Sequence, residues 1–138
     1  MWIWFALGSA LFAGVTAVLA KVGVAGIDSN LATFLRTAVV LLLAAVIVSL
    51  RADWSSIASV SPRTLAFLAL SGLATGASWL CYFRALQLAP ASWVAPVDKL
   101  SVVVAIGLGI TLLGEPVSAK LLAGAALIVA GTLIIAIP

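Results

Sequence analysis

The chain of 138 residues contains no histidine, one cysteine and only four acidic residues. Histidine is the commonest metal ligand and the commonest general base, so its absence removes the usual residue for either task. The single cysteine, Cys81, cannot form a disulfide within the chain. The few acids are not paired at one membrane depth, which argues against an intramembrane enzyme. We therefore predict neither a metal site nor a cofactor.

Charge is scarce as well: 8% of the residues are charged, 65% are hydrophobic, and the mean hydropathy is +1.36. A soluble domain is roughly half apolar and about a quarter charged. A globule of this length cannot bury so much apolar surface, so lipid must be the solvent for most of it. The formal net charge of +3 comes from basic residues scattered among apolar runs, which excludes a nucleic-acid partner.

Five apolar segments are long enough to cross a bilayer, which takes about 20 residues of helix. They cover residues 2–20, 31–50, 65–86, 92–113 and 117–137. Glycine, proline and short polar residues separate them, and the longest polar piece covers residues 51–62. The sequence therefore predicts an all-α integral membrane protein with five transmembrane helices, forming a single domain over residues 1–138.

Basic residues are balanced between the two sides of the predicted membrane protein. Arg51, Arg63 and Lys120 fall on one side, and Lys21, Arg36 and Arg84 on the other. A bias of Lys and Arg between loops normally sets orientation, and here it is absent. This balance favours dual topology, in which copies insert both ways and pair antiparallel. The alternative is that another cue fixes one orientation.

Charged residues inside the apolar segments are the first candidates for function. Asp98 and Lys99 lie within the fourth segment, and Arg36 lies at a similar depth in the second. A charge at membrane depth costs about 3 kcal/mol or more, and such residues usually face a protein interior or a water-filled path. Asp98 shares a helix face with Ser101 and other small residues, whereas Lys99 shares a helix face with a row of bulky valine and isoleucine side chains. Neighbours on a helix are about 100° apart, so the two should serve different surfaces.

Two roles remain open for Asp98. It could hold Arg36 in place by an ion pair, with or without a substrate, or it could act as a protonation switch. Pro96 leaves the local geometry open too. The fourth helix could begin at Pro96, with Asp98 in its first turn, or begin with Ser92 as its cap and kink at Pro96. We favour the second geometry.

Other polar residues are predicted to line a path for substrate or ions. Trp79 and Tyr82 rank first among these, on the polar stripe of the third segment or beside it. A second rank comprises Arg84, Thr33, Thr16 and Ser78. Serine and threonine stripes also hold helices together, and Arg84 could merely reach to the interface. Gly124 and Gly131 lie on one face of the fifth segment, where close helix approach is their natural use.

Several motifs resemble the EamA domain of the drug/metabolite transporter superfamily. They are YFRAL at 82–86, APAS at 89–92, LLGEPVS at 112–118, GAALIVAGTLI at 124–134 and the second segment with Arg36. The resemblance implies one half of a ten-helix inverted-repeat transporter, because most members carry two inverted five-helix repeats. It implies a multi-pass protein of a bacterial-type inner membrane that exports a small metabolite as an antiparallel homodimer. The alternative is a non-transporting subunit that pairs with another membrane protein.

The last segment is also similar to that of the small multidrug resistance exporters. That likeness implies that Gly124 and Gly131 form a dimer contact. Those exporters carry an essential glutamate in their first helix, eight residues before a lysine. The matching position here, counted back from Lys21, is Ala13. Their cation/proton chemistry is therefore not expected. Arg36 and Lys99 would instead attract an anionic or zwitterionic substrate.

Overall fold

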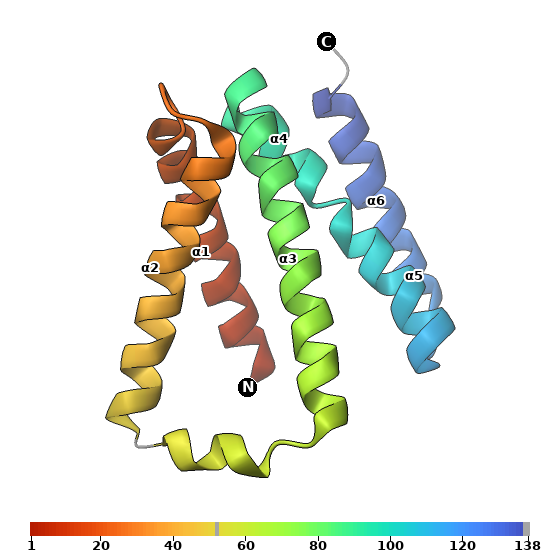
Figure 1. The fold of residues 1–138 in the computed structure, drawn as a ribbon. Coiled ribbons are helices and arrows are strands. Elements are labelled where there is room, and N and C mark those ends of the chain that lie inside the picture. Colours follow the sequence, from red (N-terminus) through yellow and green to blue (C-terminus); the bar gives the residue numbers. More distant parts are fainter. Residues whose placement is uncertain (52, 137–138) are drawn as a thin grey trace. The chain divides into compact units, whose positions relative to one another are not determined.

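The computed structural model describes residues 1–51 and 53–136, and every regular element within them is a helix (Figure 1). In chain order these are α1 (Trp2–Gly23), α2 (Ser29–Leu50), η1 (Asp53–Ser59), α3 (Pro62–Leu88), α4 (Ala91–Asp98), α5 (Ser101–Leu113) and α6 (Ala119–Ala136). The short η1 is a 3-10 helix and the others are α-helices. The predicted all-α fold is confirmed.

Five helical stretches are long and apolar enough to cross a membrane. They are α1, α2, α3, the stretch Ala91–Leu113 formed by α4 and α5, and α6. At most 11% of the most apolar window in each is buried by the rest of the chain. Most of their side chains must therefore be covered by lipid or by other protein, as the composition predicts.

Local chemistry sets where two of these helices begin. Asp28 caps α2, because its Oδ1 accepts hydrogen bonds from the backbone N–H groups of Asn30 and Leu31 at 2.9 and 3.2 Å. Proline is tolerated in the first turn of a helix, and α3 begins at Pro62. Both helices begin two or three residues earlier than the apolar runs alone predict.

The described chain divides into two compact units, and the first is Ala20–Gln87. In it, η1 joins α2 to α3 at the bottom of Figure 1. Its small core lies where the turn between α1 and α2 meets the last turns of α3, around Val24 and Leu86. The Lys21 ammonium donates a hydrogen bond to the carbonyl of Leu86, and the Gln87 amide donates to that of Ile27 at 2.8 Å. These bonds tie the two parts of the unit together.

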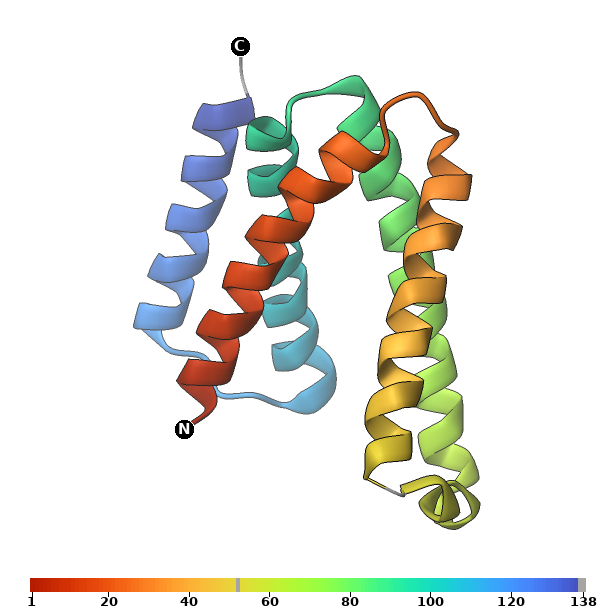
Figure 2. The same ribbon diagram turned by 90° about the vertical axis from the view of Figure 1, so that its left-hand side faces the viewer.

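The second unit comprises residues 1–19 and the described residues from Leu88 onward. Helix α6 packs along α4 and α5 in it (Figures 1 and 2). Gly114 ends α5 with φ at +68°, a conformation that glycine adopts without strain. The first residue of α1 and the last of α6 lie at opposite ends of this unit in both views, as expected for an odd number of crossings.

Candidate functional site

The fourth membrane-spanning stretch is broken beside its two charged residues. Helix α4 ends at Asp98 and α5 begins at Ser101. Pro96 lies inside α4, where a proline lacks the N–H that a helix needs. The N–H groups of Lys99 and Leu100 then bond three residues back, at 3.0 Å each, rather than four. Such bonds tighten the backbone into a 3-10 turn and interrupt the α-helix.

Two expectations about this stretch are wrong. Ser92 does not cap the helix, because Pro90 takes the cap position and Ser92 lies within the first turn of α4. The helix does not begin at Pro96 either, because α4 begins at Ala91. The interruption comes at Lys99 and Leu100, after Pro96 rather than at it.

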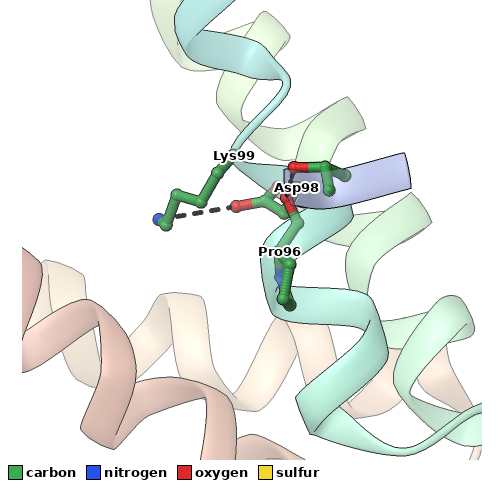
Figure 3. Close-up of polar contacts among 4 residues, drawn as sticks. Pro96, Asp98 and Lys99 are labelled. Carbon is green, nitrogen blue, oxygen red and sulfur yellow. Dashed lines mark hydrogen bonds and ion pairs between the residues drawn. The ribbon is translucent and has the colours of Figure 1, made fainter. Parts of the chain in front are cut away.

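Asp98 and Lys99 form an ion pair at this break, with 3.9 Å between Nζ and Oδ2 (Figure 3). Their side chains are 38% and 54% exposed, so neither is sealed within the chain. The prediction that they serve different surfaces is wrong, because the long Lys99 side chain reaches the neighbouring carboxylate although successive residues point in different directions from a helical backbone. The pair therefore presents both charges together beside the break in the helix.

Helix α6 supplies a hydroxyl to the broken stretch. The Thr132 Oγ1 donates a hydrogen bond to the Pro96 carbonyl at 3.2 Å, and Thr132 is 5% exposed. In a continuous helix this carbonyl would accept from Leu100, whose N–H instead bonds to Val97. The sequence analysis missed Thr132. Thr132 could have been singled out because it is the one uncharged polar side chain of α6.

Replacing Thr132 with valine, which has nearly the same shape, should lower the free energy of unfolding by about 0.6–1 kcal/mol, the usual range for such a bond in a membrane protein. Thermal unfolding in detergent measures this change. Thr111→Val is the matched control, because the Thr111 hydroxyl bonds to Gly107 within its own helix. A Thr132→Val protein as stable as wild type would contradict a supporting role for this bond.

In the unit Ala20–Gln87, Arg36 of α2 stacks on aromatic rings of α3. Its guanidinium carbon lies 3.9 Å from the centroid of the Trp79 ring and 5.7 Å from that of Phe83. Tyr82 is close enough to interact with it electrostatically. Rings at this distance attract a cation through their quadrupole. Among the described residues of this unit, no carboxylate pairs with Arg36 and no acceptor takes its hydrogen bonds.

The structure thus brings together three residues that the sequence analysis proposed for the path: Arg36, Trp79 and Tyr82. Phe83 was missed. It lies four residues after Trp79, so both rings share one face of α3, and that spacing was the signal. The predicted pairing of Arg36 with Asp98 would join the two units, and it stays a prediction.

The other proposed residues are spread over the fold. Thr33 is buried and donates to the Ser29 carbonyl of its own helix at 2.8 Å. The Nη1 of Arg84 donates to Gln87 at 2.9 Å. Thr16 is half-buried in α1, whereas Ser78 in α3 and Ser101 at the start of α5 are exposed. Their roles in a path stay predictions.

Gly124 and Gly131 lie exposed on α6. A Cβ atom built on either glycine would meet nothing within 4 Å. Within its own unit, nothing in the described chain therefore packs closely around these two glycines. The dimer contact predicted there is not made within one copy and stays a prediction.

Five apolar spans, two of which carry charged side chains more than five residues from either end, define a multi-pass membrane protein of the kind that moves solutes. The chain matches the EamA-like transporter family over residues 1–137 and belongs to that family. It is 52% identical over 136 residues to a Sinorhizobium sp protein named "Uncharacterized transporter in cobO 3'region", covering 99% of this chain and 96% of that protein. No solved structure matches. The predicted resemblance is confirmed, and the chain is a membrane transporter rather than an enzyme.

Proposed function

We propose that this transporter exports a small anionic or zwitterionic metabolite across a bacterial-type inner membrane. Arg36 is the observation that carries the proposal. Its charge lies within a spanning helix, where a cation costs about 3 kcal/mol or more. Stacking on Trp79 offsets part of this cost but leaves the guanidinium N–H donors without an acceptor in their unit. A substrate carboxylate or phosphate fits that planar fork with two parallel hydrogen bonds.

Asp98 and Lys99 form a second charged element of the proposed path. Broken helices in carriers often supply the groups that bind substrate and coupling ions near the membrane midplane. Lys99 adds a positive charge, and Asp98 would either balance the cations or exchange a proton during transport. The ion pair at 3.9 Å is loose enough for an incoming anion to compete for Lys99.

We also propose that two copies pair antiparallel to form the working unit. Five spans match one inverted repeat, and the basic residues of the loops show no bias that would fix one orientation. The open face around Gly124 and Gly131 offers a surface for close helix approach. Each copy would then contribute one Arg36 and one Asp98–Lys99 pair.

A bulky side chain on this face should block pairing without disturbing the single copy. Gly131→Leu is expected to weaken dimerisation at least about tenfold, a change of about 1.4 kcal/mol. Energy transfer between labelled copies in liposomes measures the dimer fraction. Gly107→Leu is the control, because Gly107 is equally exposed and a Cβ there also meets nothing within 4 Å. Equal dimer fractions in the two variants would contradict an interface on α6.

Flux through purified protein tests the function itself. The protein is reconstituted in liposomes loaded with labelled amino acids, organic acids or phosphorylated metabolites, and release is followed against empty liposomes. Release of at least one anionic or zwitterionic solute is expected. If no solute moves and a second membrane protein copurifies from native membranes, the protein is a non-transporting subunit instead.

A further inference from the structure

A shallow cavity of about 540 Å³, wide open to the surroundings, lies in the unit Ala20–Gln87 between the start of α2 and the part of α3 near its C-terminal end. Its lining residues are Asp28, Ser29, Asn30, Leu80, Cys81 and Arg84. Pockets of this size hold small molecules in many proteins. At about 100° per residue, the lining residues of α3 lie about 120° around the helix from Trp79 and Phe83. The cavity is therefore a different surface from the one that holds Arg36.

The two charged residues of the cavity keep unused binding capacity. Asp28 caps α2 through Oδ1 alone, so its Oδ2 has no hydrogen bond within the described chain. Arg84 donates to Gln87 through Nη1, which leaves Nη2 and Nε free. The two residues do not pair with each other, because the ion pair found among the described residues joins Asp98 and Lys99. The cavity thus presents an anionic group and a cationic group at separate points.

Ser29 adds a hydroxyl to the same cavity. It is 6% exposed, and its hydroxyl has no hydrogen-bond partner among the described residues. No side-chain polar atom of the described chain is both sealed and unpartnered, so this hydroxyl must be reached from the cavity that Ser29 lines.

We propose that this cavity binds a small zwitterion that carries a carboxylate and an ammonium group. The carboxylate would bond to Arg84 and to the Ser29 hydroxyl, and the ammonium to Asp28, with the short apolar part of the molecule along Leu80 and Cys81. A simple anion would lie against Asp28, and a simple cation against Arg84, so neither satisfies both charges. Arg84 is the one lining residue that also ranks among the predicted path residues. The proposal rests on the cavity itself and does not depend on the proposed transport function.

Cys81, the one cysteine of the chain, lines the cavity and is exposed, so it reports on occupancy directly. The full chain in liposomes is treated with methyl methanethiosulfonate, and the rate of Cys81 modification is followed by mass spectrometry. Alanine and γ-aminobutyrate serve as zwitterionic probes with two charge separations. Acetate and ethylammonium at equal concentration serve as single-charge controls. A zwitterionic probe should slow modification about tenfold at ten times its half-protecting concentration.

Protection of Cys81 by the zwitterion should disappear in Arg84→Gln and in Asp28→Asn. Asparagine still caps α2 but carries no charge. It should persist in Arg63→Gln, at the other end of α3, and in Arg36→Gln, which separates this site from transport. A variant counts as folded if its thermal midpoint, and its rate of Cys81 modification without any probe, match those of wild type. If Arg84→Gln does not fold, Asp28→Asn alone decides the test. The proposal is overturned if neither zwitterion protects, if acetate protects as well as they do, or if protection survives loss of either charge.

Discussion

Replacing Arg36 with glutamine should lower substrate flux into or out of liposomes about 100-fold, because a hydrogen-bonded charge is worth about 3 kcal/mol to a charged ligand. Glutamine fills similar space but carries neither the charge nor the two-pronged fork. The protein should stay folded, since the change removes an unpaired charge from a spanning helix rather than creating one. Flux of the substrate found in the liposome screen measures the effect.

Two further variants sharpen this test. Arg36→Lys keeps the charge but loses the planar fork and its stacking on Trp79, so an intermediate flux is expected. Arg63→Gln is the matched control, because Arg63 also lies over an aromatic ring, that of Phe67 at 5.9 Å, but at the polar start of α3. Wild-type flux in Arg36→Gln, or an equal loss in Arg63→Gln, would contradict a role for Arg36 in binding substrate.

Replacing Asp98 with asparagine should lower flux at least about tenfold, a barrier increase of about 1.4 kcal/mol. Asparagine has the same size and leaves Lys99 without its partner beside the break in the helix. Both side chains are partly exposed, so the variant should stay folded, and thermal unfolding in detergent checks this. Unchanged flux in Asp98→Asn would remove the pair from the transport path.

A charge exchange separates the two roles open to Asp98. In the double variant Asp98→Lys with Lys99→Asp, the pair is kept but the carboxylate moves by one position. Recovery of flux would mean that pairing is what matters. Loss of flux together with loss of its response to a pH gradient would mean that the Asp98 carboxylate exchanges a proton.

Much of the fold is predictable because the bilayer imposes a simple requirement on sequence. A spanning helix needs a long apolar run, and each of the five runs became helix. The charged candidates were found by the same logic, because Arg36, Asp98 and Lys99 are costly where they lie. The position of Trp79 next to the polar stripe of α3 predicted a role in the same path as Arg36. It did not predict that the two side chains stack on each other.

The break in the fourth stretch was not predictable in detail. At the break the Pro96 carbonyl accepts from the Lys99 N–H and also from the hydroxyl of Thr132, 36 residues further along the chain. Periodicity along one helix carries no information about such a partner. The contact between Asp98 and Lys99 was missed as well, because helix spacing describes where side chains start and not how far a long lysine side chain reaches.

Antiparallel pairing is tested most directly by locating the C-terminus. Alkaline phosphatase, active outside the inner membrane, and green fluorescent protein, active inside, are each fused after residue 138. Dual insertion predicts comparable activity from both reporters. Adding Ser55→Lys and Ser56→Lys to the loop that holds η1 should shift activity to one reporter, since added basic residues favour the cytoplasmic side. A wild-type C-terminus found on one side only would contradict the antiparallel homodimer.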